Sequence, residues 1–191
     1  SILVAATSLL AFAFIFVNLR LAVRATPVMD IFESFDSQDP LTRFREFFNE
    51  RFLKYRLWGA IGLSLFLGAG ASQLWEQVLL FINQKSFGVV DPVFQYDVSS
   101  YVFGLPLYRL FVSWGFQLVI FTSFIIILFF IATGALQLRQ GRLPEVSSGA
   151  KAHLSVLLAF VALLKAFAYR LDAMELLILQ EVKFLVQATQ M

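Results

Sequence analysis

The chain has 191 residues, of which 59% are hydrophobic and only 15% charged, and its net charge is +2. A soluble domain of this size carries about a quarter of its residues as charged side chains, so the composition excludes a soluble protein and favours an integral membrane protein. The nearly balanced charge excludes nucleic acid as a partner. The absence of cysteine excludes disulfides, thiolate metal sites and iron–sulfur clusters held by this sequence.

Four apolar runs follow one another, at about residues 2–17, 57–81, 107–136 and 153–169. The first has no small-residue cleavage site, so we do not expect it to be a signal peptide. Because the chain opens on Ser1 rather than methionine and is apolar at once, we expect the natural N-terminus to lie upstream. A hydrocarbon core ~30 Å thick needs about 20 helical residues, which the third run exceeds. The second run reaches this length only when its clean part, about residues 57–71, is extended to Phe81, and the first and fourth runs reach it with their flanks. Backbone groups in lipid must be satisfied internally. The runs therefore predict an all-α integral membrane protein with about four transmembrane helices, in one helical membrane domain over residues 1–191.

Between the first and second runs, residues 39–56 are predicted to form an amphipathic helix on the cytoplasmic side. Asp39 can cap its N-terminus with Pro40 in the first turn, and Phe44 and Phe48 belong to a series of apolar residues at helical spacing. Such a helix lies along the membrane surface with its aromatic side chains in the lipid boundary. A docking helix for a partner subunit is the alternative.

The second run carries small residues at four-residue intervals, namely Ala60, Ser64, Gly68 and Ser72. Small side chains at this spacing let helices approach closely in lipid. We expect this face to pack on a neighbouring helix, either within the chain or in a partner.

Basic residues are distributed unevenly among the connections. Ten lie between the first and second runs or between the third and fourth, whereas four lie between the second and third runs or after the fourth. The positive-inside rule then predicts that the connection between the first and second runs and the connection between the third and fourth runs are cytoplasmic. The connection of residues 83–109 is therefore predicted to be extracytoplasmic.

This loop of residues 83–109 mixes turn formers, two aspartates and several aromatic residues, and we expect it to be ordered. Aspartates in turns usually bond their own backbone, so Asp91 and Asp97 are expected to fix the loop, together with Pro92 and Pro106 and with Arg109 as a candidate charge partner. Two carboxylates holding a cation such as calcium are the alternative, and no metal site is predicted.

The aromatic residues of the same loop fit an interfacial belt, because aromatic rings prefer the headgroup level of a membrane. A ligand-binding aromatic box is the alternative interpretation. The residues concerned are Phe87, Phe94, Tyr96, Tyr101, Phe103 and Tyr108.

The polar intramembrane candidates are Lys165, inside the fourth run, and Asp172, just after its end. A charge inside a span costs about 2.5–3.5 kcal/mol on insertion scales, so Lys165 is expected to snorkel to the interface or to form an ion pair. Tyr169 and Asp172 share its helical face. A polar pathway or ligand site is the alternative. The amphipathic tail of residues 171–191 either extends this helix or lies flat on the surface.

His153 is the single histidine of the sequence and opens the fourth run. A helix-start or headgroup contact near the cytoplasmic surface is its ordinary role. One imidazole can also ligate haem or chlorophyll. No cofactor is predicted, and chlorophyll or another pigment at His153 is the alternative.

Three ordered stretches carry a family resemblance. The first lies in the loop and includes Asn83, Phe87–Gly88, Asp91–Pro92, Phe94, Asp97–Ser99, Tyr101–Phe103, Leu105–Pro106 and Tyr108–Arg109. The second is Asn18–Leu19 with Leu21–Ala22, and the third is His153–Leu157 followed by Leu163–Ala166 and Tyr169–Asp172. Together they resemble uncharacterised protein family 0182, multi-pass bacterial membrane proteins of actinobacteria and cyanobacteria. Ser100 and Gly104 depart from its pattern. The resemblance covers the later part of the family's membrane region, so we expect a fragment or a natural short form, and it implies no established activity.

No phosphate loop, activated nucleophile or zinc motif is present in the sequence, so no catalytic residue and no enzyme activity are predicted. We expect a non-catalytic accessory or scaffold subunit of a larger bacterial membrane complex, with the lipid bilayer and membrane-protein subunits as partners. Its membrane would be the plasma membrane, or the thylakoid in a cyanobacterium. A transporter or envelope-substrate handling protein with a polar site near Lys165 is one alternative, and a pigment-binding photosynthetic subunit is another.

Overall fold

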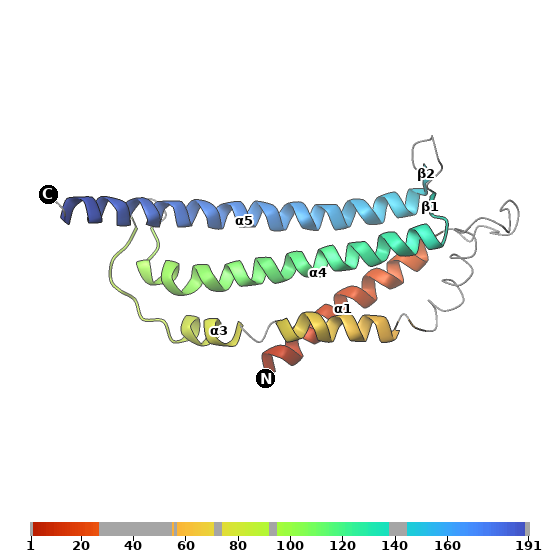
Figure 1. The fold of residues 1–191 in the computed structure, drawn as a ribbon, viewed down its shortest axis with the longest axis horizontal. Coiled ribbons are helices and arrows are strands. Elements are labelled where there is room, and N and C mark those ends of the chain that lie inside the picture. Colours follow the sequence, from red (N-terminus) through yellow and green to blue (C-terminus); the bar gives the residue numbers. More distant parts are fainter. Residues whose placement is uncertain are drawn as a thin grey trace, which may run out of the picture.

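The computed structural model describes residues 2–26, 55, 57–70, 74–91, 95–137 and 145–189, with side chains as far as Leu176. Its elements in chain order are α1, an unlabelled helix Leu57–Ala69, α3, η2, α4, β1, β2 and α5. In Figure 1, α4 lies between α5 on one side and α3 on the other, and α1 crosses the bundle obliquely. The predicted helix of residues 39–56 falls outside the described residues apart from Tyr55.

Helix α1 spans Ile2–Ala25, eight residues beyond the expected end at Val17. The helix continues because its first strongly polar residue is satisfied within the helix: the side-chain amide of Asn18 donates to the Phe14 carbonyl at 2.8 Å. Arg20 and Arg24 are exposed on the same helix.

The expected span of residues 57–81 is instead two helices, Leu57–Ala69 and α3 (Leu74–Ile82), whose axes are bent by 54°. The first of them packs against both α1 and α4. Trp114 of α4 donates its indole N–H to the Leu67 carbonyl at 3.2 Å. This hydrogen bond ties α4 to the end of the helix just before the bend.

Helix α4 runs over Leu105–Ala132 and is preceded by one π-helical turn, η2 (Ser100–Gly104). Pro106 lies in its first turn, where a missing backbone N–H is tolerated. Gly134, with φ of 73°, ends the helix. Helix α4 thus begins before the expected span of residues 107–136, because the last part of the predicted loop is already helical. It also ends sooner than expected, at Ala132.

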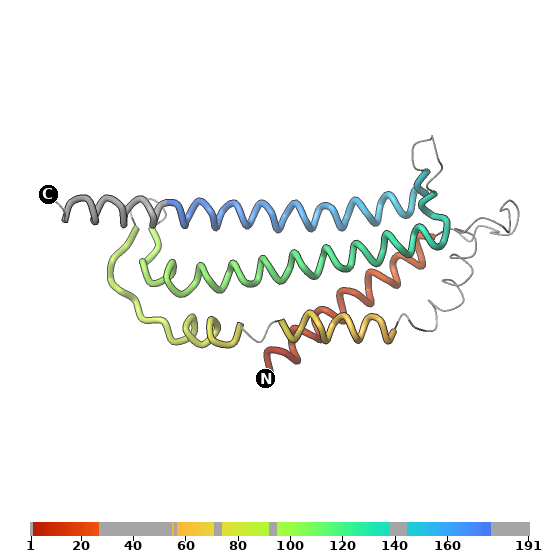
Figure 2. The backbone as a smooth tube through the Cα atoms, in the orientation of Figure 1, coloured from red at the N-terminus to blue at the C-terminus, as the bar shows by residue number. Residues whose placement is uncertain are grey.

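A short antiparallel hairpin, β1 (Leu136–Gln137) paired with β2 (Glu145–Val146), connects α4 to α5 and adds a small sheet to the expected all-α fold. Helix α5 then runs without interruption over Ser148–Thr189. The expected span of residues 153–169 and its amphipathic tail as far as Thr189 therefore form one helix. The coloured part of this helix in Figure 2 runs on from the hairpin without a break.

The core lies where α1, α4, α5 and the helix Leu57–Ala69 meet. Its largest fully buried side chains include Ile15, Ile126, Phe130 and Leu157, which come from three different helices. Three helical segments, Ile2–Ala25, Ser100–Ala132 and Ser148–Leu176, are long and apolar enough to cross a membrane, and the bent pair makes a fourth if it counts as one span. The expectation of about four long apolar helical segments is confirmed to this extent.

Candidate functional site

The Asp97 carboxylate organises the turn that follows α3. It accepts hydrogen bonds from the Ser86 hydroxyl, from the backbone N–H groups of Phe87 and Gly88 at 3.1 Å each, and from that of Ser99 at 2.8 Å. These donors favour the charged form, so the bonds from Ser86 and then Ser99 hold the pKa of the Asp97 carboxyl well below its usual range. Asp97 thus bonds its own loop backbone.

Asp91 forms a second set of hydrogen bonds within the loop. Its carboxylate accepts a hydrogen bond from the Tyr101 hydroxyl at 2.9 Å, while its backbone N–H donates to the Tyr96 carbonyl at 2.8 Å. An isolated bridge pairs Val90 with Asp97. The two carboxylates therefore serve different hydrogen-bond networks, and within the described part of the chain no three His, Cys, Asp or Glu side chains gather as a metal site. Pro92 lies outside the described residues.

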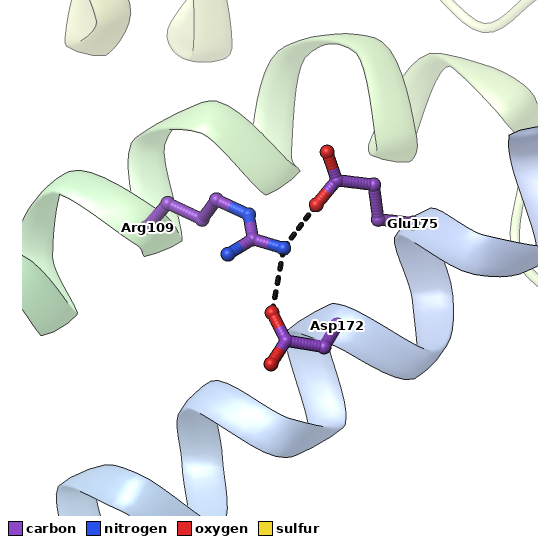
Figure 3. A network of polar contacts seen from close by, with 3 residues as sticks. All are labelled: Arg109, Asp172 and Glu175. Carbon is purple, nitrogen blue, oxygen red and sulfur yellow. Dashed lines mark hydrogen bonds and ion pairs between the residues drawn. The ribbon is translucent and has the colours of Figure 1, made fainter.

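Arg109 joins α4 to α5. Figure 3 shows its guanidinium between two carboxylates of α5, with its Nη2 atom 2.8 Å from Asp172 Oδ1 and also paired with Glu175. The sequence suggested a loop aspartate as its partner, and this expectation is wrong. Asp91 and Asp97 already receive donors within the loop, whereas the first turn of α4 faces α5.

The Arg109 ion pair is expected to contribute modestly to stability, because its side chains are 39% and 46% exposed. A double-mutant cycle with Arg109→Gln and Asp172→Asn should give a coupling of about 0.5–1 kcal/mol. Unfolding of the purified chain in mild detergent measures it, with Glu76→Gln as a surface control. Strictly additive effects of the two substitutions would contradict the assignment.

A pocket of about 300 Å³ lies between the loop, the C-terminal end of α3, the N-terminal end of α4 and the middle of α5. Its polar lining includes Gln84, Ser100 and Arg170, and the buried Oε1 atom of Gln84 has no hydrogen-bond partner among the described residues. Five aromatic side chains form much of the wall, namely Phe81, Tyr96, Tyr101, Tyr108 and Phe167. Three of them belong to the aromatic set considered from the sequence.

Lys165 is exposed on α5, and its ammonium lies 4.7 Å from the centre of the Tyr169 ring. This is a cation–π contact between residues one helical turn apart. Asp172, which shares the helical face, pairs with Arg109. The two polar candidates of the fourth run therefore have different partners.

His153 lies in the second turn of α5 and is buried, rather than at the exposed start of the helix. Its Nε2 atom is 3.0 Å from Asn18 Oδ1 of α1, and its ring packs edge-on against Phe130 of α4. Its Nδ1 atom is buried without a partner among the described residues. The single histidine thus links two helices through the nitrogen that a pigment metal would otherwise use most readily.

A groove of about 870 Å³ runs between α1 and α5 around this pair. Small residues line it at Ala13, Ala25, Gly149 and Ala152, alongside the polar Asn18, Arg24 and His153. A Cβ atom built on Gly149 would overlap the Ala25 carbonyl oxygen. The two helix ends are therefore in backbone contact at one end of the groove.

The small-residue face of the helix Leu57–Ala69 packs inward. Ala60 and Ser64 are 2% and 3% exposed, and Gly68 contacts Ser8 of α1 so closely that a Cβ atom would overlap its hydroxyl. Ser72 lies outside the described residues.

Some residues of these sites could not be singled out from the sequence. Gln84 and Glu175 belong to no motif, and only the fold places Gln84 in the pocket and Glu175 beside Arg109. Arg170 lies in a stretch that resembles the family, but nothing in the sequence indicated its place in the pocket. Asn18 did carry a signal, since it opens one of the stretches that resemble the family.

Comparisons with known proteins address the resemblance directly. The model of the uncharacterised protein family UPF0182 matches residues 1–186. The chain is 35% identical to a UPF0182 protein of Rhodococcus jostii (strain RHA1) over 178 residues, and 36% identical to one of Mycobacterium tuberculosis (strain ATCC 25618 / H37Rv) over 176 residues. Each alignment covers 92% of this chain and 18% of the relative.

A UPF0182 protein of Nocardia farcinica (strain IFM 10152) is 34% identical over 176 residues, which is 92% of this chain and 17% of that protein. The chain thus spans less than a fifth of the length of the curated relatives it matches. No solved structure matches it. The family predicted from the loop residues and from the two helical stretches is confirmed, and the chain belongs to UPF0182.

Proposed function

We propose that this chain is a non-catalytic scaffold segment of a bacterial membrane protein assembly, with the groove between α1 and α5 as its packing surface. The carrying observation is the groove's lining: small residues lie beside a buried polar pair, His153 and Asn18. A surface that is covered only by lipid tails requires neither small residues nor a buried polar pair. Helices in membranes use small residues for close approach and polar side chains for hydrogen bonds between helices.

The exposure of α5 supports the same function. Only 11% of the most apolar stretch of Ser148–Leu176 is buried, against 39% for Ser100–Ala132. A helix of this length and composition is covered in a membrane by lipid or by other helices. Further helices of the same long family protein, or a partner subunit, are the occupants that fit the groove.

The membrane setting completes the proposal. The apolar helices lie in a bacterial plasma membrane, or in a thylakoid if the source is cyanobacterial, and the uneven distribution of basic residues supports an extracytoplasmic position for loop 83–109. In this arrangement Lys165 is an interfacial anchor, since its ammonium is exposed and lies over Tyr169. No titratable residue is then required for chemistry.

Site-specific photo-crosslinking in native membranes tests the packing surface. Val156 lines the groove and is 54% exposed, whereas Leu163 lies on α5 outside the groove and is 67% exposed. A photoreactive amino acid at Val156 should give one discrete protein product, within the same chain or to one partner. The same group at Leu163 should label mainly lipid.

Mass spectrometry of the products separates the outcomes. A single crosslinked peptide that is specific to Val156 supports the scaffold function. Lipid adducts at both positions in equal amounts, with no protein product, would remove the groove as a packing surface.

A further inference from the structure

Arg170 is a cation in the wall of the aromatic pocket without a carboxylate partner among the described residues. The two acids that follow it on α5, Asp172 and Glu175, both accept hydrogen bonds from Arg109. The Arg170 guanidinium is therefore available to an anion from outside the chain. Its planar set of donors matches the geometry of a phosphate group.

Gln84 adds an unmet hydrogen-bond acceptor to the same pocket. Its Oε1 atom is buried and receives no hydrogen bond from the described residues. A buried acceptor without a donor is unfavourable, and a ligand hydroxyl would satisfy it. A ligand that satisfies the polar part of the pocket therefore carries both an anionic group and a hydroxyl donor.

The remaining wall is aromatic. The rings of Phe81 and Tyr108 pack edge-on with centroids 6.0 Å apart, and those of Tyr96 and Tyr101 do so at 6.5 Å. Phe167 is 46% exposed beside them. Aromatic side chains of this kind concentrate at the headgroup level of membranes. The acyl tail of a bound ligand can therefore extend out of the pocket along these rings.

We propose that this pocket binds a phosphate ester that carries hydroxyl groups, with its phosphate on Arg170 and a hydroxyl on Gln84. A volume of about 300 Å³ accommodates the headgroup rather than the whole of a lipid. Phosphatidylglycerol has this chemistry, and free inorganic phosphate shares its anionic part. The proposal is independent of the scaffold function, because the pocket and the α1–α5 groove are lined by different residues.

Native mass spectrometry of the whole chain in mild detergent tests the pocket. Phosphatidylglycerol should bind more tightly than phosphatidylcholine, and Arg170→Gln should weaken its binding about tenfold, the loss expected for one charged contact. Arg20→Gln removes an exposed arginine of α1 that does not line the pocket, and it should leave binding unchanged. Equal binding of the two lipids, or equal binding by wild type and Arg170→Gln, overturns the proposal.

Two further arms identify the ligand source. In a competition experiment, displacement of phosphatidylglycerol by millimolar inorganic phosphate supports the site with phosphate itself as a ligand. Failure of phosphate to displace the lipid supports a lipid ligand. Gln84→Leu should weaken phosphatidylglycerol but not phosphatidic acid, which has no headgroup hydroxyl. If Arg170→Gln does not fold, Arg170→Lys and Gln84→Leu carry the test, and unchanged lipid preference in both overturns the proposal.

Discussion

Gly68→Ala is expected to force α1 and the helix Leu57–Ala69 apart and to destabilise the chain by about 1–3 kcal/mol, as overpacked core substitutions do. A Cβ atom at Gly68 would overlap the Ser8 hydroxyl and lie 2.8 Å from Ser8 Cβ and 2.9 Å from Ser8 Cα. Because one of these atoms belongs to the backbone, rotation of the serine side chain cannot relieve the contact. Unfolding in mild detergent measures the loss.

The same helix provides a matched control. A Cβ atom added at Gly62 would have no neighbouring atom within 4 Å among the described residues, so Gly62→Ala should be neutral or stabilising by about 0.5–1 kcal/mol through helix propensity alone. Ser8→Gly should recover part of the loss caused by Gly68→Ala. Equal destabilisation at both glycines would show that the contact between the helices is unimportant.

Asp97→Ala is expected to release the turn after α3, because four donors lose their common acceptor at once. Amide hydrogen exchange should rise by about tenfold or more at Gly88 and Ser99, whose N–H groups point at this carboxylate. The helical segments should exchange as before. Glu76→Gln, which removes an exposed acid from nearby α3, should leave the turn protected.

The same turn should respond to acid. The pKa of Asp97 is lowered in the folded chain, so its contribution to stability is fully present above the ordinary pKa of aspartate, about 3.9. It is lost as the pH falls below that value toward the folded pKa. The protection factor of the Gly88 amide, which corrects for the intrinsic pH dependence of exchange, should therefore be constant between about pH 5 and 7 and should fall only in stronger acid. A fall in this protection factor between pH 5 and 7 would contradict the role of Asp97.

The sequence predicted the apolar helices well, because a long apolar segment in lipid satisfies its backbone hydrogen bonds by forming a helix. It predicted helix ends poorly. The run that appeared to end at Val17 continues through Asn18, because the amide of Asn18 bonds to Phe14 within the helix and its oxygen meets His153 from the other end of the sequence. The end of an apolar run is therefore not the end of the helix that contains it.

The candidate sites show the same division. The bonding of Asp97 to its own turn follows from local chemistry, which a sequence displays. The partner of Arg109 lies 63 residues away on α5, and the pocket joins Gln84 to Arg170 through the packing of three helices. Such pairs depend on how helices rotate about their axes, and the nearly uniform apolarity of α4 gives no periodic signal for that rotation.

The uninterrupted α5 also has a mechanical consequence. Its 42 residues make a rod about 63 Å long, roughly twice the ~30 Å thickness of a hydrocarbon core. A rod anchored at one end by His153 and near its middle by the Arg109 ion pair behaves as a lever. A tilt of about 10° within the bilayer would displace a point ~30 Å beyond it by about 5 Å. A displacement at the His153 end is thus transmitted to the far end at about the same size, because the helix extends about 28 Å from His153 to Asp172 and about 26 Å from Asp172 to Thr189.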